Sequence, residues 1–411
     1  MRRVFHIISH FDLGGAERVA ANIASSPTEG IEWHVVEIQR GRSAYTPRFI
    51  AELKAKGVHV HRALMPDVRF HFLLERLEAL LFPLRFLCLW LRWRPDVVHA
   101  HTEGPDMCVV LTFTLFPWLR KHVRLVRTIH NTRLWTGQPW IGGRVERFYQ
   151  RHAVNVAISQ SVLAAYQETY SSIFSSRAGS PGDRSSRASE CHASLLADGR
   201  AQPRVSKGRP YKQWNIHSSL IYNGVPEVPQ RPYSHLVSGK VNILFSGRFE
   251  PQKGIRTLIE VVQRVAERED CPYYFHLFGD GSLREELVVA LGGLPCVSIS
   301  GPLFGLAEQL GDFDYMFMPS EFEGLSMVAI EASMAGLPNI INDAPGLGET
   351  LPEDWPLTVE GNDVEAFVRI FREVLPSADR VSLGRQAHDY VAARFSLAAM
   401  QAGYEQIYLD L

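Results

Sequence analysis

Short apolar runs alternate with amphipathic stretches along most of the chain, and this alternation limits what the chain can fold into. Runs such as VNILFS, YYFHLFG and YMFMP are rich in β-branched and aromatic residues, which suits strands buried on both faces. Strands that alternate with helical segments are typical of a parallel α/β sheet. The expected strands are 3–9, 33–38, 96–100, 124–129 and 154–158 in the first half, and 241–246, 273–278, 296–300, 314–318 and 339–341 in the second. The pattern therefore predicts two doubly wound Rossmann-like units.

The length also favours two domains, because 411 residues exceed what one core usually holds. We place the first Rossmann-like domain at 1–170 and an interdomain linker at 223–240, where YNGVPEVPQRPYSHLVSG collects Pro, Gly and Asn. The second domain is expected at 241–375. The remaining residues, 376–411, are expected to form closing helices that could pack back on the first domain.

Two segments interrupt this organisation. Residues 171–222 contain a Ser- and Arg-rich insertion followed by the end of the first domain. The part without any periodicity, 171–213, is either a flexible insertion, which we favour, or a functional lid. Residues 69–94 form a strongly apolar helical segment interrupted by arginines and by Pro83. It is expected either to form core helices with exposed arginines or to lie in a membrane interface.

Charge is distributed unevenly along the chain. Residues 1–170 carry 22 Lys and Arg against 14 Asp and Glu, residues 171–224 carry 8 against 3, and residues 225–411 carry 13 against 27. The basic half indicates either an anionic partner, such as a membrane surface, or attraction between the two halves. Five scattered cysteines without a CxxC pair indicate reduced thiols and a cytoplasmic protein.

Ligands of open α/β sheets bind beyond the carboxyl ends of the strands, so the residues after each strand are the candidates for a site. After the first strand, Gly14 and Gly15 would let the backbone approach a phosphate at a helix N-terminus. This pair is common in such turns and is not the GxGxxG of nicotinamide or flavin enzymes. After the first strand of the second domain, GRFEPQKG places Arg248 and Lys253 on one loop. A forked guanidinium and a compact ammonium suit the oxygens of a pyrophosphate.

The strand at 314–318 is followed by PSEFEGLSMVAIEASMAG, with Glu323 expected in the loop and Glu331 in the helix. Eight residues of helix rise about 12 Å, which matches the span from a donor sugar to a ribose. Because carboxylates accept hydrogen bonds from vicinal hydroxyls, one glutamate suits each end of such a ligand. Glu331 also lies in an apolar run, where an unpaired carboxylate is costly. Backbone N–H groups at the helix start would hold the phosphate between them; these belong to Gly324, Leu325 and Ser326.

In combination, GGAERV, GRFEPQKG, FGDG, PSEFEGLSMVAIEASMAGLP and IYNGV resemble glycosyltransferase family 4. Its members are retaining enzymes with two Rossmann-like domains that face a central cleft, the GT-B architecture. The likeness extends to about residue 350, apart from the insertion. It implies an acceptor-binding first domain and a second domain that binds a nucleotide sugar.

The resemblance also implies roles for individual residues. Glu331 would bind the ribose and Glu323 the donor sugar, while Arg248 and Lys253 would hold the diphosphate. Gly15, next to Gly14, would lie against the donor near the reacting centre.

Three further residues follow from the same resemblance. His130, in TIHN after the strand 124–129, matches the family's cleft histidine, the alternative being an ordinary loop histidine. It completes a catalytic set with Glu323, Arg248 and Lys253. Pro302 and Leu303 match the loop that packs on the nucleotide base.

No DxD-type metal motif lies at a strand end, so we expect neither a metal nor another cofactor in the reaction. Likeness alone favours a UDP-sugar over a GDP-sugar as donor. The implied acceptor is a glycan or a lipid-diphosphate-linked sugar in capsule, exopolysaccharide or lipopolysaccharide synthesis, at the cytoplasmic side of a membrane. We expect no nucleic-acid partner. Two alternatives remain open, a sugar-nucleotide 2-epimerase of the same architecture and a catalytically silent nucleotide-sugar-binding protein.

Overall fold

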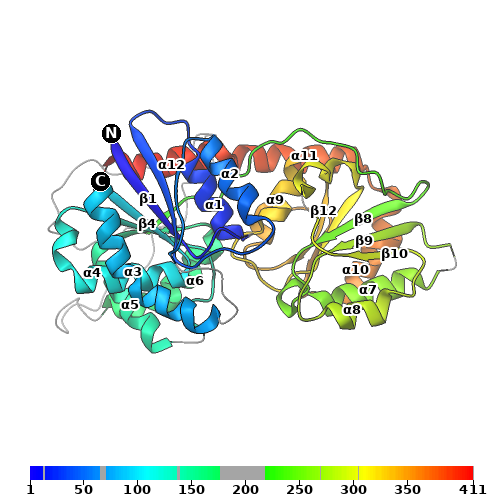
Figure 1. The fold of residues 1–411 in the computed structure, drawn as a ribbon. Helices are drawn as coiled ribbons and strands as arrows, with labels where there is room; N and C mark the ends of the chain where they lie inside the picture. The colour runs from blue at the N-terminus through cyan, green and yellow to red at the C-terminus, as the bar shows by residue number, and fades with distance from the viewer. Residues whose placement is uncertain are drawn as a thin grey trace.

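The structure is a computed structural model that describes residues 1–12, 14–64, 71–136, 139–175, 218–268, 270–303 and 305–410. The expected lid or insertion at 171–213 therefore falls largely outside the described residues. Figure 1 shows two α/β lobes side by side, with the first half of the chain in one lobe and most of the second half in the other.

The first lobe is built on a seven-stranded sheet in which every neighbouring pair is parallel. Its order is β3-β2-β1-β4-β5-β6-β7. The strands are β1 (Arg2–Ile8), β2 (Ile31–Glu37), β3 (His59–His61), β4 (Val97–His101), β5 (Arg124–Ile129), β6 (Ala153–Ala157) and β7 (Ser218–Leu220). The helices are α1 (Gly15–Ala24), α2 (Thr46–Ala55), α3 (His71–Trp93), α4 (Glu103–Leu115), α5 (Pro139–His152) and α6 (Gln160–Ser175).

The second lobe repeats this topology with six parallel strands in the order β10-β9-β8-β11-β12-β13. The strands are β8 (Val241–Ser246), β9 (Tyr273–Phe278), β10 (Val297–Ser300), β11 (Tyr315–Met318), β12 (Asn339–Asp343) and β13 (Thr358–Glu360). The helices are α7 (Ile255–Ala266), α8 (Arg284–Leu291), α9 (Met327–Met334), α10 (Val364–Arg369) and α11 (Arg380–Arg394), and the chain ends in α12 (Leu397–Asp410), which belongs to the first lobe. The predicted pair of doubly wound Rossmann-like domains is thus confirmed.

The ten expected strands are present within one or two residues of their predicted ends. The structure adds β3, β7 and β13, which have three residues each and lie at sheet margins. Such short edge strands carry too few residues to show the alternation or apolar run that identifies longer strands.

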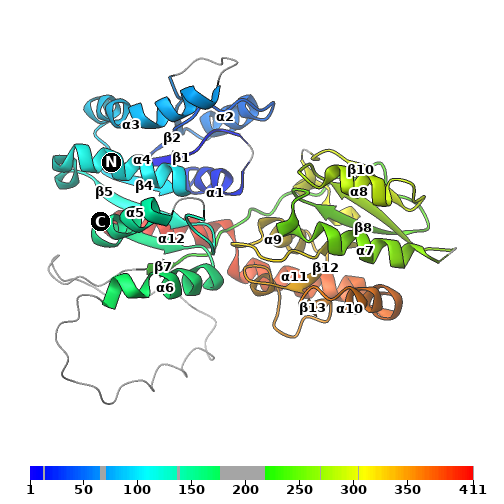
Figure 2. The same ribbon diagram turned by 90° about the horizontal axis from the view of Figure 1, so that it is seen from below.

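The C-terminal segment joins the two lobes. After the bridge between Val225 and Ser396, α12 leaves the second lobe and packs on the first sheet (Figures 1 and 2). Met400, Tyr404 and Tyr408 of α12 are buried in the same apolar core as β1 and α1. The first lobe is therefore completed by the last residues of the chain.

Candidate active site

The direction of strand order reverses at the same place in both sheets, between β1 and β4 in the first and between β8 and β11 in the second. The crevice beyond the carboxyl ends of the strands at such a reversal is the usual ligand site of open α/β sheets. In the second domain the crevice is bordered by the loop 247–254 after β8 and the loop 319–326 after β11. These two loops carry most of the predicted donor-site residues.

The two loops are bonded to each other. The backbone N–H of Glu321 donates to the carbonyl of Gln252 at 2.8 Å, and the Gln252 side-chain amide donates to the carbonyl of Phe322 at 3.0 Å. Gly254 adopts the left-handed conformation, with φ of 65°, and an added Cβ would lie 1.8 Å from the Pro319 oxygen. Only glycine fits there, so the GRFEPQKG motif ends in a glycine for a steric reason.

This contact brings Lys253 and Glu323 together. The Lys253 ammonium donates to Glu323 Oε1 at 2.5 Å, and both side chains are largely buried. Arg248 remains exposed, and its guanidinium donates to Gln252 Oε1 at 3.3 Å. Three of the predicted catalytic residues therefore border one crevice, and two of them form a direct ion pair.

The start of α9 supplies donors to the same crevice, although not the full set that was predicted. The N–H of Ser326 already donates to the carbonyl of Gly346 at 3.0 Å, so it cannot also bind a phosphate. The hydroxyl of Ser326 is buried and has no partner within the described residues. The N–H groups of Gly324 and Leu325, together with that hydroxyl, are the donors that remain.

Glu331 lies one turn into α9 and is half-buried. Burial raises the pKa of its carboxyl to about 7, against a smaller opposing effect of Arg18. Arg18 belongs to α1 of the first domain, where Glu52 accepts two hydrogen bonds from it at 2.8 and 2.9 Å. Glu331 also lines a small pocket between α9 and the linker, with Pro226, Val228, Gln230, Ala307, Met334 and Ala335.

The two glycines after β1 differ in their surroundings. Gly14 has extended backbone, and an added Cβ would lie 2.1 Å from Glu17 Oε2, because the buried Glu17 side chain folds back over it. Gly15 opens α1 and has nothing within 4 Å of an added Cβ. Space for a ligand is therefore available at Gly15. At Gly14 a glycine is needed for packing within the first domain, because a side chain there would collide with Glu17.

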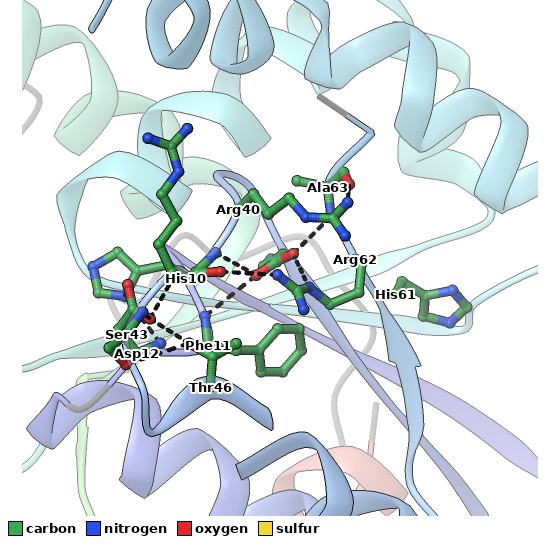
Figure 3. Close-up of polar contacts among 12 residues, drawn as sticks. His10, Phe11, Asp12, Arg40, Ser43, Thr46, His61, Arg62 and Ala63 are labelled. Carbon is green, nitrogen blue, oxygen red and sulfur yellow. Dashed lines mark hydrogen bonds and ion pairs between the residues drawn. The ribbon is translucent and has the colours of Figure 1, made fainter. Parts of the chain in front are cut away.

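A loop of the first domain is fixed beside these glycines. Asp12 accepts hydrogen bonds from the N–H groups of Arg42 and Ser43, both at 2.8 Å, and from the hydroxyl of Thr46 (Figure 3). Burial alone would raise the pKa of Asp12, but hydrogen bonds from Thr46 and Ser43 lower it below its usual value.

The buried Glu37 fixes the other end of this loop. It accepts from the N–H groups of Gly41 at 3.0 Å and Ala63 at 2.8 Å, and from the Arg62 guanidinium at 2.5 Å. Arg62 and Ala63 lie on the far side of the network from Asp12 in Figure 3. Sequence reasoning missed this arrangement, because neither Asp12 nor Glu37 belongs to a recognisable motif.

His130 lies where the two domains touch. Its side chain is buried, which lowers its pKa to about 3, and its Nε2 lies 3.3 Å from His101 Nδ1. A Cβ added to Gly324 would lie 1.9 Å from the His130 carbonyl oxygen. The predicted cleft histidine and the predicted phosphate loop are thus in backbone contact.

The same junction contains residues that sequence reasoning did not identify. The Ser159 hydroxyl donates to the Gly324 carbonyl at 2.6 Å, and Glu349 accepts from the N–H groups of Gln160 at 2.9 Å and Ser161 at 3.2 Å. The N-terminus of α6 is therefore docked on the second domain. The one sequence signal for this helix start is Ser159, which follows the expected strand 154–158 and is a residue type that often caps a helix N-terminus.

Pro302 and Leu303 lie after β10, at the margin of the second sheet. Pro302 is exposed, while Leu303 is partly buried against the core of the second domain. β10 is three positions away in the sheet from β11, the strand that precedes Glu331, whereas the loop that carries Arg248 and Lys253 follows β8, the direct neighbour of β11. Their predicted contact with a base remains a prediction.

Comparisons with known proteins match both domains. A family model described as Glycosyltransferase Family 4 matches residues 13–173, and one described as Glycosyl transferases group 1 matches residues 240–376. The fold is similar to that of Anabaena HepE in complex with UDP-glucose, with a TM-score of 0.72 and 14% identity over 100% of both chains.

Two curated relatives illustrate the sequence similarity. The chain is 27% identical over 350 residues to the 2-deoxystreptamine N-acetyl-D-glucosaminyltransferase of Streptomyces fradiae, covering 81% of this chain and 76% of the relative. It is 28% identical over 170 residues to the lipopolysaccharide core biosynthesis glycosyltransferase LpsE of Rhizobium meliloti, covering 40% and 48%. Other curated relatives are matched over 30% to 69% of their own length, with 53% and 31% for two of them.

Two Rossmann-like domains with this crevice and these matches define a glycosyltransferase of the GT-B class. Because the two family models together cover both domains, the chain belongs to glycosyltransferase family 4.

Proposed function

We propose that this glycosyltransferase moves a sugar from a nucleoside-diphosphate sugar, a UDP-sugar in preference to a GDP-sugar, to a glycan or lipid-diphosphate-linked acceptor of a bacterial surface polysaccharide. The observation that carries the proposal is the pairing of Lys253 with Glu323 across the two loops at the β8–β11 reversal. In the proposed complex, Lys253 would face the diphosphate and Glu323 would face hydroxyls of the sugar.

The chemistry follows from charge. Departure of a nucleoside diphosphate builds negative charge on its oxygens, and donors that already face that charge lower the barrier. Arg248, Lys253, the N–H groups of Gly324 and Leu325, and the Ser326 hydroxyl supply such donors. Glu331 would accept hydrogen bonds from the ribose. The neutral imidazole of His130 would contribute a hydrogen bond near the reacting centre rather than a charge.

The choice of donor rests on similarity. HepE was solved with UDP-glucose, and the Streptomyces relative is named for transfer of N-acetylglucosamine. A panel of UDP- and GDP-sugars, with membrane extract as acceptor and products read by mass spectrometry, tests the proposal. Turnover with GDP-sugars alone would contradict the preference for UDP.

Retention of anomeric configuration is part of the proposal, because members of the family are retaining. Proton NMR of the early product distinguishes the two anomers before they equilibrate. The 2-epimerase alternative is tested by incubation without acceptor, since an epimerase still converts the donor while a transferase leaves most of it unchanged.

The first domain also has a surface that fits an anionic membrane. α3 buries Phe82, Phe86 and Trp90 in the core, while leucines on its other side are 40–64% exposed. They recur at the spacing of one helix face: Leu77, Leu80, Leu81, Leu84 and Leu91. No helix in the part of the chain that the structure describes is long and apolar enough to cross a bilayer. A row of this kind instead suits a helix lying in the membrane interface, next to a domain with a basic excess.

The arginines of the same segment serve different purposes. Arg85 donates to the carbonyls of Glu37 at 2.6 Å and Arg62 at 2.9 Å, so its role is structural. Arg92 and Arg94 are exposed and available to anionic headgroups, although Arg94 also lies over the Trp90 ring at 3.8 Å. The side chain of Arg76 lies outside the described residues.

A vesicle sedimentation assay tests this surface. Leu80→Ser combined with Leu84→Ser should reduce binding to vesicles that contain acidic lipid, whereas Val289→Ser, at a site 86% exposed on the second domain, should not. Binding of the parent protein should weaken with salt, because exposed charges are screened within about 10 Å at 0.1 M. Transfer to a short soluble acceptor should be unchanged. Failure of the parent protein to bind vesicles at low salt would remove the membrane from the proposal.

A further inference from the structure

A second cluster of polar side chains lies at the opposite end of the first sheet from the donor crevice. Glu32 and His34 point to the same face of β2, and His59, the first residue of β3, lies directly beside His34 in the sheet register. Since the crevice follows the last residues of the strands, this cluster is remote from the reacting centre.

The candidate ligand atoms of the three side chains lie close together. Glu32 Oε1 lies 3.4 Å from His34 Nε2 and 3.3 Å from His59 Nε2, and the three atoms are all within 4.8 Å of one another. Two ligands bound tetrahedrally to one zinc ion at 2.0–2.2 Å are about 3.4 Å apart. The observed spacing therefore equals one edge of a zinc coordination tetrahedron.

Hydrogen bonding does not explain this convergence. His34 is fully buried, yet its Nε2 has no hydrogen-bond partner within the described residues, although the Glu32 oxygen is near. Its other nitrogen, Nδ1, lies 2.9 Å from His61 Nε2. In the tautomer whose Nδ1 donates to His61, Nε2 carries a lone pair close to the Glu32 oxygen, and a cation between these two acceptors would stabilise the arrangement.

We propose that Glu32, His34 and His59 form a binding site for a divalent metal ion of the zinc type. Two imidazoles and a carboxylate are a common zinc ligand set, and His59 is 44% exposed, so the fourth position is open to water. Arg3 takes the other oxygen of Glu32 at 2.9 Å and leaves Oε1 for the ion.

The surroundings are those of a metal site. A ligating histidine usually has its second nitrogen held by a hydrogen bond, as His61 holds that of His34. Trp93 at the end of α3 covers the cluster, with its ring centroid 4.8 Å from that of His34 and 5.0 Å from that of His59. A bound ion would therefore tie β2 to the marginal strand β3 beneath the end of α3.

Another histidine cluster is less suited to a metal. His6, His99 and His101 also lie close together, but both nitrogens of His99 are already bonded, to the Tyr408 hydroxyl at 2.6 Å and the Thr128 hydroxyl at 2.7 Å. A metal there would break both bonds in a fully buried site with no carboxylate among the three ligands.

Metal titration of the untagged, chelator-treated protein tests the proposal. One equivalent of Zn²⁺ should bind, Co²⁺ should give the visible absorption of a tetrahedral site, and Zn²⁺ should raise the melting temperature. His59→Ala and Glu32→Gln should each weaken binding at least tenfold. His388→Ala, which removes a partly exposed histidine on α11, should bind like the parent protein.

The alternatives give different results. Sub-stoichiometric Zn²⁺ binding by the parent protein would overturn the proposal. Equal affinity in the parent protein and in His59→Ala would do the same, because it would place the ion elsewhere. Far-UV circular dichroism of each variant checks that lost metal binding does not reflect lost folding. Because His59 is partly exposed, His59→Ala should leave the fold intact.

Discussion

Glu331 connects the ionisation of the donor site to nucleotide affinity, and this connection gives a sharp prediction. Burial holds the pKa of its carboxyl at about 7 in the unliganded protein. Ribose hydroxyls donate to the ionised form, so binding should deprotonate Glu331. The apparent dissociation constant for UDP should then fall roughly tenfold between pH 6 and pH 8, since each pKa unit is about 1.4 kcal/mol. Near pH 7 about half a proton should be released on binding.

Isothermal titration calorimetry with UDP in two buffers of different ionisation enthalpy measures both quantities. Glu331→Gln should weaken binding at pH 8 by about 1.5–3 kcal/mol, the value of a hydrogen bond to a charged group. It should also remove proton release by the protein. The nucleotide's own phosphate titrates near pH 6, but this contribution is the same for both proteins and cancels in the comparison. An identical pH slope in the two proteins would refute the placement of the ribose on Glu331.

The same ionisation affects stability in the opposite direction. Because the folded pKa is raised above the usual value of 4.5, the unliganded fold is most stable below pH 4.5 as far as this group is concerned. That contribution, up to about 3 kcal/mol, is lost as the pH rises through 7. Saturating UDP should restore the stability at pH 8 in the parent protein more than in Glu331→Gln.

Three further outcomes are expected. Lys253→Ala and Arg248→Ala should each lower both kcat and donor affinity in steady-state assays. The loss of kcat should be larger for Lys253→Ala, because this variant leaves Glu323 buried without its partner. Normal turnover in either variant would remove that residue from the site. Transfer should continue after treatment with a strong chelator, and loss that magnesium restores would contradict a metal-free donor site. Arg127 is buried in the first domain and donates two hydrogen bonds of 2.7 Å to the buried carboxylate of Glu146. Arg127→Met should destabilise this domain by about 3–5 kcal/mol in thermal unfolding, because Glu146 loses its cationic partner. Arg147→Met, at an exposed position, should have little effect.

The contact between the two candidate loops of the second domain could be predicted from the sequence because its determinants are local. Each loop follows a buried strand, and the residues that approach one another, such as Lys253 and Glu323, lie on loops whose strands are neighbours in the sheet. A βα repeat fixes that neighbourhood once the strands are recognised. The sequence of the GRFEPQKG and EFEGLSMVAIE segments, together with the order of the strands before them, was therefore enough to predict both their local structure and their proximity.

The loop of the first domain beside the crevice could not be predicted in the same way, because its determinants are long-range. The loop beside Gly14 and Gly15 is held by Asp12 and Glu37, two carboxylates in ordinary sequence surroundings. The predicted donation of the Ser326 N–H to phosphate failed for a similar reason, since its acceptor, Gly346, lies on a different loop. In α3, periodicity identified the helix but could not tell the half-buried Arg85, which is bonded to backbone carbonyls, from the exposed Arg92.

The contact between the domains limits how the crevice can open and close. His130 and Gly324 meet backbone to backbone, Ser159 bonds to the same glycine carbonyl, and Glu349 holds the N-terminus of α6. Each of these contacts has a main-chain group on at least one side, so the two domains are held close together at this point. Domain closure over a donor is therefore expected to pivot near His130. Closure about this pivot would bring α1, which begins at Gly15, closer to α9, which carries Glu331. Figure 2 shows these two helices on the facing sides of the two lobes.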